Sequence, residues 1–589
     1  MTTMFGTNKY YTLERVPFSA DGAFLSIYQA TDDERLYFTI CRSEPGIIIR
    51  RKLIRIEPVY EGEELPYIYY CDEARLTIET KKGTIEFVYE EPEILRVRVT
   101  GVSMRVYCEA EMHEGACEKA WGEVEIAFNL VGKLLFKNIS GRLEHNIEWD
   151  FRTVSPLPFH IDIIPDEETG AGEAAIHEYY SNCIPKDVYP PFDKAYENTK
   201  ADFQTFAKNY PEALAPYRDM AKKAEWIIWN TRLGPRGSLK NKMIYMNKVL
   251  FVRAFGWHHG FHAMAMENNV REAWNMLLVM FAHQNEYGGI PDNISDLNQE
   301  AWISTKPPIF GFATCYVLDN FDLSPLGTED YDKLYNALSK YTNWWFTQHD
   351  HMKTGYASYY HSDESGYDEA TLFDKGCPIQ APDLQAYMVM LCEACSRLAA
   401  LTGRENETEY WMSESKRVLS FLTDVLWDGE LFRARIPATG ELYKCGSVAH
   451  LQPIMLGRRL PGDIVAKIRE RLLDEDEYLT DCGIASEHLK SEHVVVRSFT
   501  RGAVTAPSQC LMLLGLHDAG EVEAAQMITA RYLNVLMGKG LGHASYTHRV
   551  EPVTGNKLMA METTPMSIGY WFSAWVSSIF LILANKVMK

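Results

Sequence analysis

The spacing of apolar residues changes once along this chain of 589 residues, and that change constrains the fold more than any other feature. From about Phe24 to Pro165, apolar and polar residues alternate in short segments separated by turns, which is typical of half-buried β-strands. From about Tyr196 almost to Lys589, apolar residues recur at helical spacing. We therefore expect an antiparallel β domain followed by an all-α domain, and not alternating βα units.

The alternating part contains many short strands without intervening helices, as in RLYFTICRS, GIIIRRKLIRI and ILRVRVTGVSMRVYCEAEM. In LTIETKKGTIEFVY, two alternating runs flank Lys81-Lys82-Gly83, which predicts a hairpin with its turn at these residues. This pattern favours an antiparallel β-sandwich.

About ten to twelve helical segments occupy about 380 residues of the second part, with long loops rich in Gly, Pro and Asn between them. This number of helices fits an (α/α)6 toroid, in which the inter-helix loops build a pocket. We expect a β-sandwich domain over residues 1–185, a linker with helices over residues 186–240, and an (α/α)6 domain over residues 241–589.

The formal net charge of −21 argues against nucleic acid or an anionic membrane as a partner, because phosphate binding requires a basic face. The first residues show no secretory signal, and the apolar stretch from Tyr570 to Ala584 is shorter than a membrane span requires. Cys392 and Cys395 form a lone CxxC without a second pair. We expect a cytoplasmic protein with core thiols; the sequence leaves open whether it forms a homo-oligomer.

The sharpest local feature is an acidic loop from Tyr359 to Glu369, in which four carboxylates surround one glycine just before a helical run. Hydrolysis of a glycosidic bond requires one carboxyl group that keeps its proton and one that is ionised. Clustered carboxylates raise the pKa of one member by like-charge repulsion, so this loop is a candidate catalytic segment. The alternative is an acidic surface loop followed by a helix that Asp383 caps.

Five stretches carry a family resemblance, over roughly residues 250–575. They are FGWHHGFHAMA with HQNEYGGIPDNI, the turn Ser304-Thr305-Lys306-Pro307-Pro308, ESGYDEATLFD followed by DLQAYMVM, FTRGAVTAP, and EPVTG. Together and in this order they resemble the WDxxFHA…HQ…GxIP, TxPP, ESGxD…DLN, YxRGPxWP and NPxTG blocks of glycoside hydrolase family 63. That family contains processing α-glucosidases and bacterial α-glycosidases.

The resemblance implies an (α/α)6 domain beside an N-terminal sandwich, and hydrolysis with inversion at the anomeric carbon. Asp368 matches the general acid of the ESGxD block, and Glu364 would supply a neighbouring negative charge. The match fails at the general base, because His548 stands where the family has a Glu. The candidates are Glu551, which we favour, Glu562, and His548 itself, whose unperturbed pKa is about 6.5.

The remaining candidate residues are expected to contact the substrate: Trp257, His258, His262, Gln284, Glu364, Tyr367, Asp383, Arg501, His548 and Trp571. Arg501 has two interpretations, a contact with sugar hydroxyls or a carboxylate, and a salt bridge at a helix end. His258 replaces an Asp of the family and Thr505 replaces a Trp, so the family's preference for α-glucosides and some α-mannosides does not transfer to this chain.

The expected function is that of an inverting, exo-acting α-glycosidase whose partner is an oligosaccharide or glycoside substrate. His258, His259 and His262 lie close in sequence, but the Glu of an HExxH motif and a third ligand are missing, so we expect neither a metal nor a cofactor. One alternative is a carbohydrate-binding pseudoenzyme, favoured by His548 at the position of the base. Another is a sugar epimerase or lyase that uses His258, His259 or His548 to carry protons.

Overall fold

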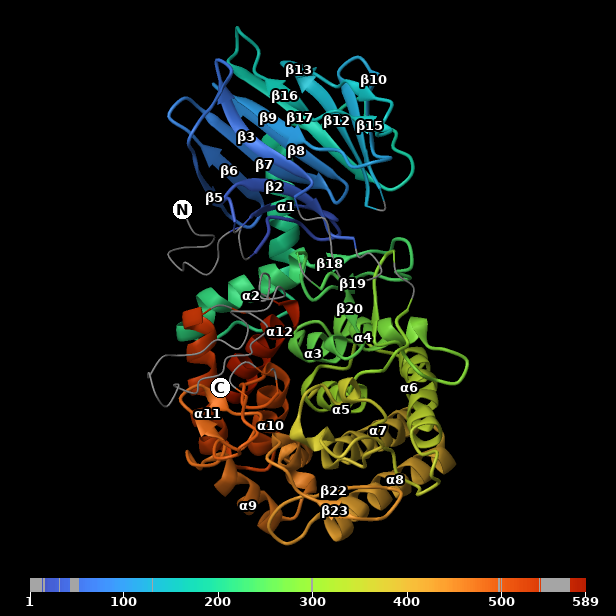
Figure 1. Cartoon of the computed structure of the whole chain (residues 1–589). Coiled ribbons are helices and arrows are strands. Elements are labelled where there is room, and N and C mark those ends of the chain that lie inside the picture. The colour runs from blue at the N-terminus through green and yellow to red at the C-terminus, as the bar shows by residue number, and fades with distance from the viewer. Residues whose placement is uncertain are drawn as a thin grey trace. The chain divides into compact units, whose positions relative to one another are not determined.

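The computed structural model describes residues 13, 16–30, 32–42, 52–129, 131–249, 251–297, 300–495, 498, 500–539, 541 and 573–589 (Figure 1). The chain forms two compact units. The β unit comprises Met1–Ala207, Glu225–Arg253 and Ser295–Asn298, and the helical unit comprises Lys208–Ala224, Ala254–Ile294 and Gln299–Lys589. The segment expected as a linker, residues 186–240, is divided between the two units.

Two antiparallel sheets make up most of the β unit. The seven-stranded sheet has the order β1-β2-β3-β9-β16-β13, with β4 paired to β3. Its strands are β1 (Leu25–Gln29), β2 (Leu36–Ile40), β3 (Ile54–Tyr60), β4 (Glu63–Glu64), β9 (Ser103–Cys108), β13 (Arg142–His145) and β16 (Phe159–Ile164). The eight-stranded sheet has the order β10-β11-β12-β17-β8-β7-β6-β5. Its strands are β5 (Ile68–Cys71), β6 (Arg75–Glu79), β7 (Thr84–Glu91), β8 (Ile94–Thr100), β10 (Gly115–Ala120), β11 (Glu123–Phe128), β12 (Gly132–Ser140) and β17 (Ala171–Tyr179).

Five short two-stranded ribbons complete the described strands. They are β14 (Trp149–Asp150) with β15 (Ser155–Pro156), β18 (Arg232–Leu233) with β19 (Met243–Ile244), β20 (Ala254–Phe255) with β21 (Asn293–Ile294), β22 (Ala434–Arg435) with β23 (Leu442–Tyr443), and β24 (Leu479–Thr480) with β25 (Gly483–Ile484).

Side-chain alternation turns one face of each large sheet toward a shared core. In β9, Met104, Val106 and Cys108 are buried, whereas the residues between them are partly exposed. The two sheets meet where Phe38 of β2 packs edge-on against Phe87 of β7, with ring centroids 6.1 Å apart. This alternation lets the two antiparallel sheets share one core, as expected for a sandwich.

The hairpin predicted at Lys81-Lys82-Gly83 is confirmed, because β6 and β7 pair antiparallel across it. The Thr80 amide donates to the Gly83 carbonyl oxygen at 2.9 Å. A Cβ at Gly83 would lie 1.9 Å from the Thr100 carbonyl oxygen, so the neighbouring strand requires a glycine here.

The helical unit is organised around a closed circuit of contacts, in the order α3, α5, α7, η7, α10, α12 and back to α3. Outside it, α6, α8, α9 and α11 each pack against one member, and α4 packs against both α3 and α5 (Figure 1). The described helices are α1 (Phe192–Ala207), α2 (Arg218–Asn230), α3 (His258–Ala265), α4 (Val270–Leu278), α5 (Phe310–Asn320), α6 (Thr328–Gln348), α7 (Pro382–Leu401), α8 (Glu405–Ser420), α9 (Gly462–Leu472), α10 (Ala506–Asp518), α11 (Val522–Lys539) and α12 (Ala574–Ile582), and the 3-10 helices used below are η3 (Ser362–Ser365) and η7 (Gln452–Arg459).

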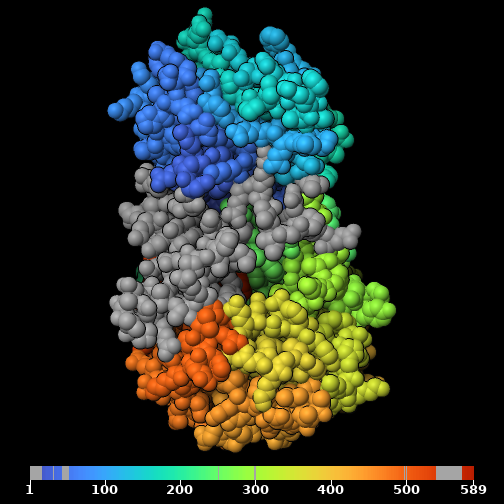
Figure 2. All heavy atoms as spheres, viewed as in Figure 1, coloured from blue at the N-terminus to red at the C-terminus, as the bar shows by residue number. Residues whose placement is uncertain are grey.

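Two members of the circuit, α3 and α12, are buried on all sides. Every residue of α3 and of α12 is buried, whereas α4 buries one face only. A helix without a polar face is stable only in an interior. On the face that Figure 2 shows, the yellow and orange segments, which include α7 to α9, form a continuous surface of side chains. The expected order of antiparallel β followed by helical structure is confirmed.

One helix among the described residues, α7, is long and apolar enough to cross a membrane by length and composition. Most of its apolar window, 78%, is buried inside the protein. Because core helices pass the same test, we interpret α7 as a central element of the circuit.

Candidate active site

The motif blocks of the helical unit stand at the N-terminal ends of circuit helices. Trp257 is the residue before α3, and the Pro307-Pro308 turn precedes α5. Asp383 is the second residue of α7, and Thr505 is the residue before α10. The acidic loop 359–369 leads into α7. Stretches far apart in sequence thus become the loops at helix starts.

The ribbon of β20 and β21 joins two of these stretches. Phe255 pairs with Asn293, and the Gly256 amide donates to the Asp292 carbonyl oxygen at 2.7 Å. The Asp292 side chain then reaches the turn before α5, where its Oδ1 lies 3.0 Å from Nζ of Lys306. The start of α3 and the turn before α5 are therefore linked through Asp292.

The acidic loop lies against Trp257. Gly366 ends η3 with a φ of +69°, in the left-handed region that favours glycine. A Cβ at Gly366 would lie 2.6 Å from the Trp257 ring and 3.4 Å from Pro307. The glycine of the ESGYD stretch thus allows the loop that carries Asp368 to rest on both neighbouring blocks.

Asp368 has the protonation behaviour of an acid catalyst. Its side chain is half-buried, and burial raises its pKa to about 6. Lys306 lowers this pKa, while the negative charges of Asp363, Asp292 and Glu369 raise it. A carboxyl group with such a pKa holds its proton in part of the molecules near neutral pH, as a general acid must.

Lys306 is the cation that faces these carboxylates. Its Nζ contacts Asp292 and donates to the Asp363 carbonyl oxygen at 3.4 Å. Burial lowers its pKa, but Asp292, Asp368 and Asp363 outweigh burial, so the net pKa is raised and the ammonium stays charged. A fixed positive charge beside Asp368 stabilises the ionised form of its carboxyl group.

Lys306 and Asp292 were missed as site residues in the sequence. Both lie inside the quoted stretches, but neither stands at a position where the family motif specifies a residue, and nothing in the spacing shows that the two side chains meet. The available signal was a charged residue next to the motif residues: Lys306 stands between Thr305 and Pro307, and Asp292 directly follows Pro291.

The residue after Asp368 is held from three sides. The Glu369 amide donates to Oγ1 of Thr500 at 3.0 Å, and the hydroxyl of Ser498 donates to the Glu369 carboxylate. Nε of Arg501 donates to the Glu369 carbonyl oxygen at 2.6 Å, and its guanidinium pairs with Asp374. In the structure, Arg501 thus binds the acidic loop.

Glu364 is turned inward, into the loop that carries it. Its carboxylate accepts from the amides of Tyr360 (2.8 Å) and His361 (3.3 Å) and lies 3.1 Å from Nε2 of His349. These contacts close η3 as a capping box. Glu364 therefore shapes the loop, and its expected contact with substrate stays a prediction.

Asp383 and Tyr367 are buried polar groups between the loop and α7. Asp383 accepts from the Tyr359 hydroxyl at 2.9 Å, and burial raises its pKa to about 7. The Tyr367 hydroxyl donates to Oε1 of Gln452 at 2.8 Å. Ala381 occupies the N-terminal capping position of α7. The alternative in which Asp383 caps this helix is therefore wrong.

Gln284 belongs to a neighbouring turn. Its Nε2 donates to the carbonyl oxygens of Gly288 at 2.8 Å and of Ala337 at 3.0 Å. The side chain thus ties this turn to α6, and its predicted contact with substrate is not tested by these bonds.

The three histidines of α3 are buried in the circuit. His258 stacks on Trp575 of α12, with ring centroids 4.2 Å apart, and Nδ1 of His262 lies 2.7 Å from the hydroxyl of Ser578. Burial lowers the pKa of His259 to about 4 and also lowers that of His262. Burial therefore favours the neutral form of His259 and His262, and the expected contacts of His258 and His262 with substrate stay predictions. Within the described ranges, no group of three His, Cys, Asp or Glu residues is placed to hold a metal ion.

His548, Glu551, Glu562 and Trp571 lie outside the described residues. The described part of the candidate site is therefore the acidic loop with Asp368, together with Lys306 and the further carboxylates around it.

Residues 253–563 match a family model described as the mannosylglycerate hydrolase MGH1-like glycoside hydrolase domain. Among solved structures, the chain is similar to GH63 mannosylglycerate hydrolase from Thermus thermophilus in complex with glucose, at 18% identity and a TM-score of 0.50, over 62% of this chain and 99% of that chain. The same enzyme in complex with Tris and D-glycerate aligns at 17% identity and a TM-score of 0.50, over 62% and 99%. Neutral trehalase from Saccharomyces cerevisiae aligns at 15% identity and a TM-score of 0.45, over 59% and 74%. The comparison with curated proteins gives no match.

The fold, the acidic loop and the family match together define a glycoside hydrolase. Because the matched residues make up more than half of the sequence, the chain belongs to the family of mannosylglycerate hydrolase MGH1-like glycoside hydrolases. The resemblance to glycoside hydrolase family 63 expected from the motif blocks is confirmed.

Proposed function

We propose that this protein is an inverting, exo-acting α-glycosidase that removes a terminal sugar from an oligosaccharide or glycoside, with Asp368 as general acid. The observation that carries this proposal is the pKa of about 6 of a carboxyl group on the loop that matches the family's ESGxD block. That protonation state fits donation to a glycosidic oxygen.

In this mechanism, the neutral Asp368 carboxyl donates its proton to the glycosidic oxygen while the bond to the anomeric carbon breaks, and the aglycone leaves as an alcohol. Water attacks the anomeric carbon from the opposite face, and the general base takes the proton that water loses. Lys306 stabilises the Asp368 carboxylate until solvent returns a proton to it. One water is consumed, and the sugar is released with inverted configuration.

For the base we propose Glu551, the carboxylate nearest in sequence to the position where the family has a Glu. Glu562 and His548 are the alternatives. In an inverting enzyme the base stands about 6.5–9.5 Å from the acid, which leaves room for the attacking water. Replacing each of the three by Gln or Asn in turn, and measuring turnover, identifies the residue.

Substrates in the first panel follow from the family and its relatives: mannosylglycerate, α-glucosides, α-mannosides and matched β-linked glycosides. The replacement of family residues by His258 and Thr505 supports a sugar preference that differs from that of processing α-glucosidases.

A proton NMR time course on this panel tests the proposal. We expect one α-glycoside to release the β-anomer first, and Asp368→Asn to lower turnover by about 10²-fold or more. Asp463→Asn, an exposed aspartate at the start of α9, is the matched control and keeps full activity.

Several results would contradict the proposal. Release of the α-anomer first would mean retention. Full activity of Asp368→Asn would remove this residue from the reaction. Binding of sugars without turnover would favour a pseudoenzyme, and a product with a new double bond or an inverted ring carbon would favour a lyase or an epimerase.

A further inference from the structure

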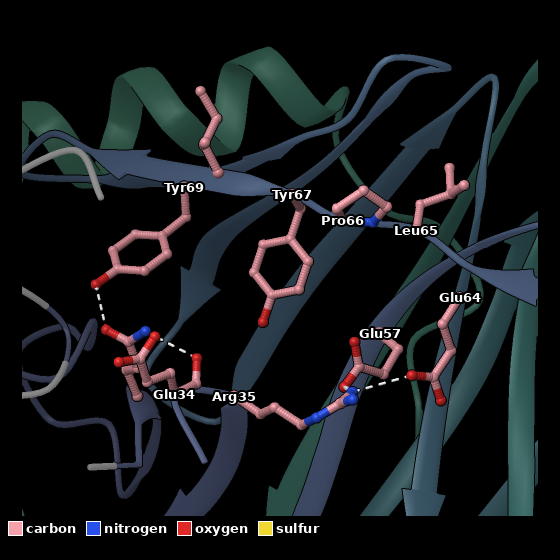
Figure 3. Close-up of a pocket in the computed structure, with 10 residues that line it drawn as sticks. Glu34, Arg35, Glu57, Glu64, Leu65, Pro66, Tyr67 and Tyr69 are labelled. Carbon is pink, nitrogen blue, oxygen red and sulfur yellow. Dashed lines mark hydrogen bonds and ion pairs between the residues drawn. The ribbon is translucent and has the colours of Figure 1, made fainter. Parts of the chain in front are cut away.

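The β unit contains a pocket far along the sequence from the acidic loop. It has a volume of about 470 Å³, within the range of about 300–1,000 Å³ that small-molecule sites occupy. Figure 3 shows it beside the seven-stranded sheet. The lining residues that matter here are Gln29, Arg35, Glu57, Glu64, Tyr67 and Tyr69.

Arg35, Glu57 and Glu64 line the floor of this pocket and belong to a balanced network that Arg55 of β3, outside this lining, completes. Arg35 pairs with Glu57 and lies 2.9 Å from Glu64. Arg55 lies 2.9 Å from Glu57 and 3.2 Å from Glu64. Because each charge already has a partner of opposite sign, the floor offers hydrogen-bond donors and acceptors without a net charge for an ionic ligand.

Two tyrosines from one segment complete the pocket. The Tyr69 hydroxyl donates to Oε1 of Gln29 at 2.8 Å, and Nε2 of Gln29 donates to the Glu34 carbonyl oxygen at 2.8 Å, so this wall is fixed. The ring of Tyr67 stands in the pocket, with its hydroxyl directed toward the floor (Figure 3). Tyr67 is half-buried and presents a ring face to an occupant.

A second pocket, of about 620 Å³, lies on the same sheet. It is lined by a row of side chains that the strand register sets opposite one another: Tyr37 of β2 faces Arg55 of β3, Arg55 faces Tyr107 of β9, and Tyr107 faces His160 of β16. The Arg55 guanidinium lies 4.1 Å from the centroid of the Tyr107 ring. Arg55 also pairs with the two carboxylates of the first pocket, so it connects both.

We propose that this face of the seven-stranded sheet, which we call the tyrosine–arginine face (Arg35, Arg55, Glu57, Glu64, Tyr67 and Tyr107), is a binding site for a neutral oligosaccharide. Pyranose rings have apolar faces that pack on aromatic rings, and hydroxyl groups that both donate and accept hydrogen bonds. Tyr67 and Tyr107 supply the rings, and the paired arginines and glutamates supply both kinds of polar partner.

This site is separate from the candidate active site around Asp368, because all of its residues belong to the β unit. It would bind a longer oligosaccharide through residues that take no part in the proposed hydrolysis. We therefore expect its contribution to binding to grow with oligosaccharide length and to be absent for monosaccharide glycosides.

Isothermal titration of the full chain carrying Asp368→Asn tests this, because the probe is then not consumed. The probes are maltohexaose, an α-linked mannohexaose and cellohexaose, with methyl α-glucoside and methyl α-mannoside as short controls. We expect at least one hexasaccharide to bind, and Tyr67→Ala or Tyr107→Ala to weaken its binding about tenfold or more. Tyr67→Phe, which keeps the aromatic ring, should weaken the binding of the hexasaccharide much less.

The matched control is Tyr70→Ala, which removes a 41% exposed tyrosine three residues away that does not line the pocket. Melting temperatures of all variants show whether each one folds. The proposal is overturned when no hexasaccharide binds, or when Tyr67→Ala and Tyr107→Ala bind every probe as tightly as Tyr70→Ala.

The outcome is separable from that of the proposed hydrolysis. Cleavage of methyl α-glucoside and methyl α-mannoside by the unmodified chain tests hydrolysis alone, because these short substrates are not expected to depend on the tyrosine–arginine face. Failure of all cleavage would contradict the proposed function and would leave the titration result valid.

Discussion

At the scale of single residues, two carboxyl groups of the helical unit have raised pKa values for different reasons. Asp368 is half-buried among other charges, with Lys306 opposing the effect of burial. Asp383 is fully buried, with the Tyr359 hydroxyl as its hydrogen-bond donor and no partner for Oδ1 among the described residues. The first arrangement suits a group that releases and regains a proton, and the second favours the neutral form of Asp383 below about pH 7.

The burial of Asp383 predicts a pH-dependent stability. Its pKa in the folded state is about 7, above the usual value of 3.8, so the folded state binds this proton more tightly than the unfolded chain. The resulting stabilisation is complete below about pH 4 and is lost as the pH rises through about 7. Asp383→Asn, which carries no charge, should therefore lose less stability than the natural chain between pH 5 and pH 8, by a few kcal/mol at most.

Melting temperatures measured from pH 5 to pH 8 check this difference in slope. A constant offset between the two proteins is expected as well, because an amide group adds a buried donor. Asp463→Asn, at an exposed position, should follow the natural chain throughout. Parallel curves for Asp383→Asn and the natural chain would show that Asp383 is ionised in the folded state.

At the scale of elements, the acidic loop depends on a segment more than one hundred residues further along the chain. Thr500 and Arg501 bind the backbone of Glu369, and Ser498 binds its carboxylate. The adjacent Asp368 thus receives its position from contacts that do not involve its own side chain. A small displacement of a catalytic group reduces rate far more than it reduces stability.

Arg501→Met should therefore lower kcat by about 10- to 100-fold with little change in KM. Because the Arg501–Asp374 pair is partly exposed, the stability cost should stay within about 1 kcal/mol. The control is Arg458→Met, which removes an arginine that pairs with Asp518 at the surface of the same unit and should keep full kcat. Steady-state kinetics give kcat and KM for both variants, and thermal melting gives their stability. A loss of stability that accounts for the loss of activity would make Arg501 a purely structural residue.

At the scale of the whole molecule, segments distant in sequence meet in the β unit around a buried ion cluster. Arg42 pairs with Glu178 and lies 3.0 Å from Asp296, and all three side chains are at most 2% exposed. Arg236 donates to Glu178 at 2.5 Å. Burial raises the pKa of Asp296 to about 6, and Arg42 opposes that shift. The cluster ties the segment Ser295–Asn298 to strands that lie more than one hundred residues earlier.

Removing the central cation should be costly. Arg42→Met leaves two buried carboxylates without this partner, and we expect a loss of about 3–5 kcal/mol in unfolding free energy of the β unit. The control Arg142→Met breaks exposed pairs with Glu144 and Glu167, and should cost no more than about 1 kcal/mol. Urea unfolding followed by circular dichroism measures both. An equal, small effect of the two changes would mean that the buried carboxylates are neutral without Arg42.

The motif blocks show how much of the site sequence could reveal. The ESGYD stretch led to Asp368 as the candidate acid, whereas the left-handed conformation of Gly366 became known only from the structure. The same reasoning expected Glu364, His262 and Gln284 at the substrate. The structure gives these three local partners, because residue type and spacing do not tell which way a side chain turns.

Periodicity by itself determined the order of the two fold classes and the hairpin at Lys81-Lys82-Gly83, because side-chain alternation and turn chemistry are local properties of the chain. Tertiary structure alone decided that Lys306 and Asp292 meet beside Asp368, and that Arg501 holds its loop. It also decided that Tyr37, Arg55, Tyr107 and His160 form one row across four strands. Such contacts depend on strand register and helix packing between segments far apart in sequence, which no local pattern encodes.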